Sequence, residues 1–172
     1  MGDNMTHLPE AEYLFVSAEI AAAFVGFASV VAILGQRSGR DDASLDTFRV
    51  RVMIEAGLLT VFAALLPVLL HRTGFGESIW RVSSALTAAT GAAVFAGTVR
   101  RFPRSKATRE SRSVANFGGI LLFVPTLVLV FAAFGVPADA ASSYFVALYI
   151  YLASAALGLF RVVTSLLSSV PR

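Results

Sequence analysis

Five long apolar runs constrain this chain more than any other feature. A helix needs roughly 20 apolar residues to cross the hydrocarbon core of a bilayer. The mean hydropathy of +0.74 and the hydrophobic fraction of 56% are typical of polytopic membrane proteins and exceed those of soluble domains. The sequence therefore predicts an all-α polytopic membrane protein, one domain over residues 1–172 with five transmembrane helices. The predicted spans are approximately Tyr13 to Leu34, Val52 to Leu70, Ile79 to Val99, Phe117 to Val136 and Ser143 to Val163.

The distribution of basic residues predicts the orientation of these spans. With the N-terminus outside and the C-terminus inside, twelve of the 14 Lys and Arg residues fall on the inner side, and only Arg72 and Arg81 fall outside. Basic residues concentrate in cytoplasmic loops, and aromatic residues concentrate at the interfaces. Tyr13, Trp80 and Tyr144 would then lie at outer ends of spans. We expect an N-out, C-in topology in a plasma membrane.

Two acids, Glu19 and Glu55, lie inside the predicted spans, where a charge costs at least about 2.5–3.5 kcal/mol. Counted from the span ends, Glu19 would lie roughly 9 Å below the outer boundary, and Glu55 within about 5 Å of the inner one. We expect two structural ion pairs at these depths, Glu19 with Arg81 and Glu55 with Arg161. Arg51 competes for Glu55, because it lies four residues earlier on the same helix face. The alternative role of the acids is ion or proton movement.

The first and third runs also carry small residues at every fourth position, which give helices smooth faces for close packing. These are Ala18, Ala22 and Gly26 in the first run, and Ala85, Ala89 and Ala93 in the third.

Hydroxyl residues share roughly one helical face of the third run. They could line a polar path, or they could bond back to carbonyl oxygens of their own helix. The four residues concerned are Ser83, Thr87, Thr90 and Thr98.

A basic loop follows the third run. Its charge predicts contact with anionic lipid headgroups on the cytoplasmic side, worth about 1 kcal/mol per residue. Nucleic-acid binding is not expected, because Phe102 is the loop's one aromatic residue. The basic residues are Arg100, Arg101, Arg104, Lys106, Arg109 and Arg112.

Residues that commonly carry catalysis or bind metals are scarce. The chain has no cysteine, and His7 and His71 lie outside the apolar runs. No phosphate-binding Gly-rich loop, zinc-protease motif or nucleophile elbow occurs. We therefore expect no enzyme activity, no cofactor and no metal.

The first run contains Ala18-Glu19 followed by the segment Phe24 to Phe27, the second begins with Glu55-Ala56-Gly57 and contains Pro67, and the third opens with the segment Trp80 to Ser84. In these features the chain resembles a family of small multi-pass proteins of bacterial inner membranes. The resemblance extends over most of the chain and implies a bacterial origin. It brings no assigned activity.

Two functions remain open on these observations. The first is a non-enzymatic structural or accessory subunit that packs through its small-residue helix faces against a second copy or another membrane protein. The second is a small oligomeric ion or proton channel or carrier that uses Glu19 and the hydroxyl face of the third run. An ion-paired Glu19 in a dry interface favours the first function, and an acid facing a polar cavity favours the second.

Overall fold

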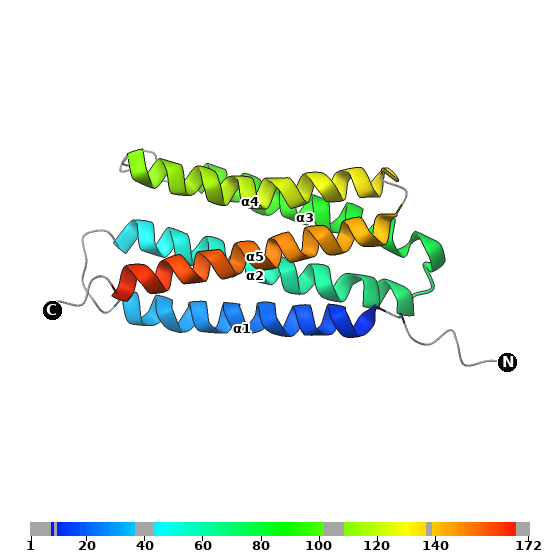
Figure 1. Cartoon of the computed structure of the whole chain (residues 1–172), viewed down its shortest axis with the longest axis horizontal. Helices are drawn as coiled ribbons and strands as arrows, with labels where there is room; N and C mark the ends of the chain where they lie inside the picture. Colours follow the sequence, from blue (N-terminus) through cyan, green and yellow to red (C-terminus); the bar gives the residue numbers. More distant parts are fainter. Residues whose placement is uncertain (1–7, 9, 37–42, 102–108, 137–138, 168–172) are drawn as a thin grey trace.

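The structure is a computed structural model of the chain, and it describes residues 8, 10–36, 43–101, 109–136 and 139–167. These residues form a bundle of long helices that lie side by side, with the two termini at opposite ends (Figure 1). The prediction of an all-α fold is confirmed. The helices are α1 (Ala11–Gln36), α2 (Ala43–Arg72), α3 (Ile79–Arg101), α4 (Arg109–Ala133) and α5 (Ala140–Leu167), with a short 3-10 helix, η1 (Gly76–Ser78), between α2 and α3.

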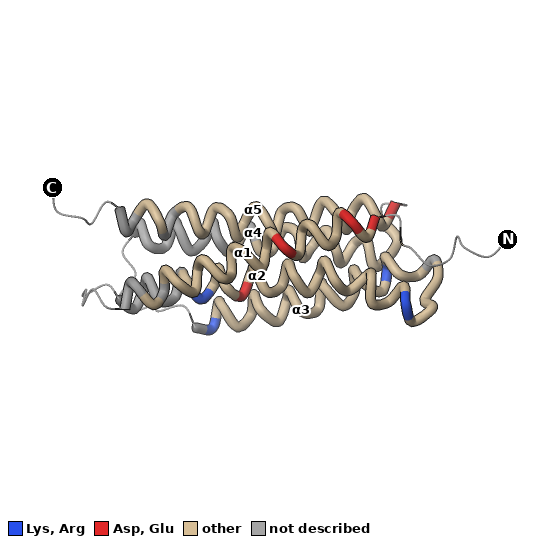
Figure 2. Tube along the Cα trace, turned by 90° about the horizontal axis from the view of Figure 1, so that it is seen from below, with Lys and Arg blue, Asp and Glu red and all other residues tan. Residues whose placement is uncertain are grey.

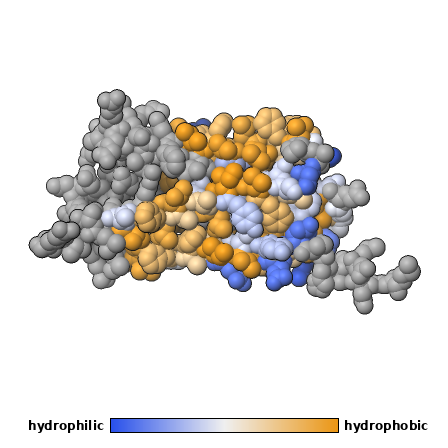
Figure 3. All heavy atoms as spheres, viewed as in Figure 1, coloured by the Kyte–Doolittle hydropathy of each residue, from blue (hydrophilic) through white to orange (hydrophobic). Residues whose placement is uncertain are grey.

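Four of the helices are long and apolar enough to cross a membrane. In α4 the apolar part within the described residues is shorter, Leu122–Ala133. Among the residues coloured in Figure 3, hydrophobic ones cover much of the face, and the strongly hydrophilic ones lie mainly in the right half of the view. These features are those of a multi-pass membrane protein. The four apolar stretches are Ala11–Val31, Val50–Arg72, Ile79–Arg100 and Ala140–Phe160.

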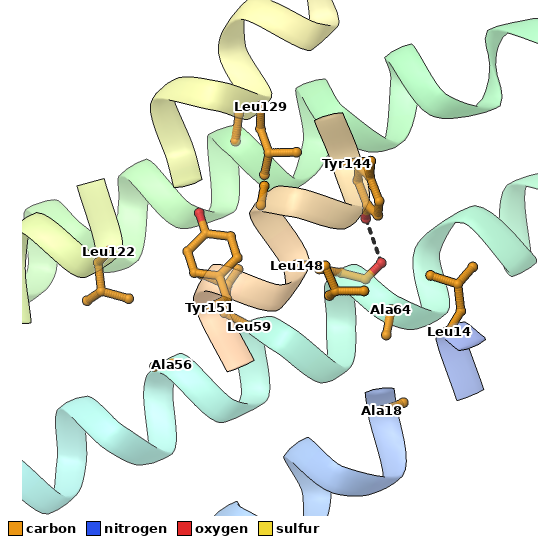
Figure 4. Packing of buried hydrophobic residues seen from close by; sticks show 13 residues of the cluster. Leu14, Ala18, Ala56, Leu59, Ala64, Leu122, Leu129, Tyr144, Leu148 and Tyr151 are labelled. Atoms are coloured by element: carbon orange, nitrogen blue, oxygen red, sulfur yellow. Dashed lines mark hydrogen bonds between the residues drawn. The ribbon is translucent and has the colours of Figure 1, made fainter. Parts of the chain in front are cut away.

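Helix α5 packs against all four other helices, and α2 packs against α1, α3 and α5. Helix α4 packs on the other side, against α3 and α5. Tyr144, Leu148 and Tyr151 project from α5 into the core between these helices (Figure 4). They share one face of α5, since residues at i, i+4 and i+7 align on a helix. The aliphatic core around them includes Leu14, Ala18, Ala56, Leu59, Ala63, Ala64, Leu122 and Leu129.

Close helix contacts fix how far each helix is shifted along its neighbour. A Cβ on Gly57 of α2 would overlap the Cγ2 methyl of Val25 and lie 3.6 Å from the carbonyl oxygen of Ala21, so Gly57 is level with residue 23 of α1. In the same way, Gly91 of α3 is level with Leu59, because its Cβ would lie 3.7 Å from Cδ2 of Leu59. Both pairs of helices run antiparallel (Figure 1). These two contacts give the relative depth of residues on α1, α2 and α3.

The turn between α4 and α5 shows how local sequence ends one helix and starts the next. Gly135 has a φ of +80°, which favours glycine, and Val136 N–H bonds back to the carbonyl of Phe131 at 3.0 Å. Asp139 then caps the start of α5. It accepts hydrogen bonds from the Ser142 hydroxyl and from the backbone N–H groups of Ser142 and Ala141, which lower the pKa of its carboxyl.

Candidate functional site

Glu55 belongs to a small polar group that joins α2 to α3. Its Oε1 accepts a hydrogen bond from Nε of Arg51 at 2.8 Å, and its Oε2 accepts a longer one from Oγ1 of Thr98 at 3.4 Å. The exposed fractions of the Arg51 and Glu55 side chains are 56% and 24%. The prediction that Arg51 competes for Glu55 is confirmed. The side chain of Arg161, its other predicted partner, lies outside the described residues, so that pair stays a prediction.

Glu19 lies on the exposed surface of α1. Because Gly57 is level with residue 23, Glu19 is level with Val61 of α2, four residues beyond Gly57. Val61 is the midpoint of the apolar stretch Val50–Arg72. The alignment of α1 with α2 thus gives Glu19 a deeper position than the count from Tyr13, and its depth in a membrane stays a prediction. Figure 2 shows acidic positions both near the end of the bundle where α1 begins and nearer its middle.

The structure does not bring Arg81 to Glu19. Because Gly91 is level with Leu59, Arg81 is level with Leu69, about 12 Å from the level of Glu19. Helix α1 packs against α2 and α5, whereas α3 packs against α2, α4 and α5. The Arg81 guanidinium lies instead at the turn after α4, where a Cβ on Gly135 would be 3.3 Å from Nη2. The expected pair of Glu19 with Arg81 is thus not formed within the described chain, because depth and neighbouring helix both differ.

The hydroxyls of α3 do not share one role. Thr90 donates to the carbonyl of Leu86 on its own helix at 2.9 Å, as one of the two alternatives predicted. Thr87 instead contacts the Tyr144 hydroxyl at 3.1 Å, and Thr98 donates to Glu55. Ser83 is fully buried. Within the described structure, the hydroxyls predicted to line one polar path therefore make separate contacts.

The Tyr144 hydroxyl group bonds to a backbone carbonyl that Pro67 leaves without its helical hydrogen bond. Proline has no N–H, so the carbonyl four residues earlier in α2, that of Ala63, lacks its helical partner. The Tyr144 hydroxyl donates to this carbonyl at 2.5 Å (Figure 4, dashed line). Since Tyr144 has one hydroxyl hydrogen, Thr87 must be the donor in the contact between the two hydroxyls. Three helices are thus joined at one hydroxyl group.

This contact revises the expected place of Tyr144 among the aromatic residues at the outer interface. Tyr144 is 1% exposed, and its ring lies against that of Trp80 at a centroid distance of 5.7 Å. Tyr13, by contrast, is 65% exposed, in keeping with an interface position. No local sequence pattern marks Tyr144 as a structural residue, although Pro67 signals that some nearby donor must serve the Ala63 carbonyl.

A second tyrosine of α5 makes a similar contact beside the other buried proline. The Tyr151 hydroxyl lies 2.6 Å from Oγ1 of Thr126, which follows Pro125 in α4. Thr126 donates its own hydrogen to the carbonyl of Leu122 at 2.8 Å, so Tyr151 is the donor in the pair. Gly91 of α3 leaves room for both groups, since a Cβ there would lie 2.6 Å from the Tyr151 oxygen.

A few polar atoms remain unpaired inside the bundle. Nε2 of His71 and the hydroxyl oxygens of Ser83 and Ser84 are buried without a hydrogen-bond partner among the described residues. Across the same residues, no group of three or more acidic, histidine or cysteine side chains is arranged to hold a metal ion.

The basic loop proposed to contact lipid is described at its first residue, Arg100, which is exposed at the end of α3. The structure describes no side chain for the remaining five basic residues, Arg101, Arg104, Lys106, Arg109 and Arg112. The lipid contact therefore stays a prediction. Comparisons with family models, with curated proteins and with solved structures found no match to the chain.

Proposed function

We propose that the chain is a non-enzymatic structural or accessory subunit of a bacterial inner membrane, where it crosses the bilayer five times with its N-terminus outside. The observation that carries the proposal is the use of interior polar groups as links between helices. Tyr144 connects α5 to α2 and α3, and Tyr151 connects α5 to α4. Groups held in this way stabilise a packed scaffold and are not free to bind a transported species.

The orientation and the lipid contacts of the proposal rest on charge. Arg51 and Arg100 lie toward the same end of the bundle, because Glu55 accepts hydrogen bonds from both Arg51 and Thr98, and the basic loop follows Arg100 in the sequence. On the cytoplasmic side these cations would meet anionic lipid headgroups, while the apolar helix surfaces contact the bilayer interior. Nucleic acid has no role in this proposal.

A flux assay tests the subunit against a transporter. The purified chain is reconstituted in liposomes, and proton and monovalent-cation fluxes are recorded under an imposed gradient and membrane potential. We expect fluxes equal to those of empty liposomes, because the hydroxyls of Tyr144 and Tyr151 and their threonine partners are committed to helix contacts. A flux above that background that is lost in Tyr144→Phe or Thr126→Val would contradict the proposal, since it would show a path through the bundle.

The second candidate function is a small oligomeric ion or proton channel or carrier. The observation that favours it is Glu19, an acid at mid-span on the outside of the bundle. A path that uses this carboxyl must run between copies of the chain, because the side chain faces away from the core. Flux that is lost in Glu19→Gln and kept in Tyr144→Phe would support this candidate in place of the subunit.

A further inference from the structure

Helix α1 has one packed face and one open face. The packed face contacts α2 and α5 through buried residues spaced three, four or seven apart, namely Leu14, Ala18, Ala21, Ala28 and Val31. The exposed residues follow the opposite side of the helix and include Val16, Glu19, Ala22, Ala23, Gly26 and Val30. An element at the edge of the bundle thus presents a full helix face to its surroundings.

The middle of the open face is nearly flat. Ala22, Ala23 and Gly26 are exposed, and a Cβ built on Gly26 would meet no atom within 4 Å. Small residues at such spacing allow the backbones of two membrane helices to approach closely. Within one copy, no described residue uses this space.

Glu19 lies one turn from these small residues and on the same open face. It is level with Val61, the midpoint of the α2 span, so the water at either surface is far away. A carboxyl group at that depth and facing lipid is expensive, and acids in spans nearly always face protein or a polar cavity. The described chain gives Glu19 no hydrogen bond or ion pair. A polar contact from outside the monomer would remove this cost.

Helix α3 provides the comparison that singles out α1. It also exposes a strip of small residues, Ala85, Ala89, Ala92, Ala93 and Ala96. That strip is wholly apolar, and the neighbouring Thr90 hydroxyl is already bonded to the carbonyl of Leu86. Lipid covers such a surface at little cost. The α1 face differs in two ways. Its small residues allow a second helix to approach closely, and its acid, Glu19, has no partner within the described chain.

We propose that a second copy of the chain covers this face, with α1 packed against α1 in a two-fold dimer. Both copies insert in the same direction, so the dimer axis is parallel to the membrane normal, and each residue meets its counterpart at its own depth. The carboxyl group of Glu19 then faces the same group in the partner. A protonated carboxyl carries both a donor and an acceptor and is therefore complementary to itself. The inference rests on the proposed subunit role and names its partner.

Single-cysteine cross-linking in membranes tests the dimer, because the chain has no native cysteine. Ala23→Cys places a thiol on the proposed contact. Ala93→Cys on α3 and Ala153→Cys on α5 are controls at the same depth, since Gly91 is level with Leu59 and Gly158 with Met53 of α2. All three alanines are exposed. A disulfide requires Cβ atoms about 3.5–4.5 Å apart, so we expect a cross-linked dimer for Ala23→Cys and monomer for both controls.

Equal cross-linking at the three positions would indicate random collisions and overturn the proposal. Monomer at Ala23→Cys, or a cross-link there to a different protein, would overturn it as well. In the Ala23→Cys background, Glu19→Leu should lower the association constant about tenfold, while Glu19→Gln should change it by less than about threefold, because the amide keeps a donor and an acceptor. These outcomes are independent of the flux assay, so the dimer and the subunit role can fail separately.

Discussion

The interior of the bundle and the open face of α1 hold their polar groups in different ways. Inside, the Tyr144 hydroxyl serves the carbonyl that Pro67 leaves unpaired, and Tyr151 is paired with Thr126. On the open face, Glu19 sits at the same range of depths with no partner in the described chain. Polar groups of the first kind hold one copy together. A polar group on the open face, such as Glu19, instead favours contact with a partner outside the copy.

The largest expected effect comes from substituting two glycines, Gly91 in the interior and Gly26 on the open face. A Cβ on Gly91 would lie 2.6 Å from the Tyr151 hydroxyl oxygen and 2.9 Å from Oγ1 of Thr126, so Gly91→Ala should lower the free energy of unfolding by about 1–3 kcal/mol. Gly26→Ala meets open space and should leave the monomer unchanged or up to about 1 kcal/mol more stable. Reversible unfolding in mixed micelles, at dilutions that keep the chain monomeric, measures both. Equal losses would show that the two faces of the bundle are not distinct.

The proline contact gives the next largest effect. Tyr144→Phe removes the donor to the Ala63 carbonyl and should cost about 1–3 kcal/mol, the usual penalty for a buried group left unpaired. Pro67→Ala restores the helical N–H to that carbonyl, so the same tyrosine substitution should cost less in this background. Tyr149→Phe is the matched control, because Tyr149 is exposed on the same helix.

A double-mutant cycle over Tyr144 and Pro67 tests this contact, using free energies of unfolding from the same micelle assay. The expected result is a coupling energy of about 1 kcal/mol, with Tyr149→Phe neutral in both backgrounds. Additive losses would mean that the tyrosine hydroxyl does not serve the carbonyl freed by proline.

The smallest expected effect concerns the coupling of the two acids, Glu55 and Glu19, to the arginines considered as their partners. Arg51 and Glu55 are paired on one helix face and should show a coupling energy of about 0.3–0.5 kcal/mol. Glu19 and Arg81 lie on helices that are not shown to pack and about 12 Å apart in depth, so their substitutions should be additive. Stability of the monomer in detergent is the readout. Coupling of Glu19 with Arg81 above that of Arg51 with Glu55 would reverse the contrast.

The helices were predictable from sequence because long apolar runs and their breakers are local features. Four of the five predicted spans fall within observed helices, as Tyr13 to Leu34 does within α1 (Ala11–Gln36), whereas the span Phe117 to Val136 runs past the end of α4 at Ala133. The i, i+4 pair of Arg51 with Glu55 follows from helix geometry alone. The relative shift of neighbouring helices was not predictable, since it depends on contacts such as Gly57 against Val25. For that reason the count from Tyr13 gives Glu19 a shallower depth than the alignment of α1 with α2 does.

The candidate site was predictable only in part. The two acids could be singled out from the sequence, because an acid in an apolar run is conspicuous. Their partners depend on which helices are neighbours, which the sequence does not encode locally. The bond from Tyr144 to Ala63 joins residues 81 positions apart and leaves no local pattern. Pro67 indicates from the sequence that the Ala63 carbonyl lacks its helical donor. The sequence does not indicate which side chain donates to it.

The mass of the purified chain in a mild detergent tests the central claim, that the open face of α1 with Glu19 is a contact between copies. Light scattering corrected for bound detergent would be recorded for the wild-type chain and for Glu19→Leu at one protein concentration. The dimer predicts twice the chain mass of 18.2 kDa for the wild type and a shift toward the monomer for Glu19→Leu. A wild-type mass of one chain, or a dimer mass that Glu19→Leu leaves unchanged, would contradict the account.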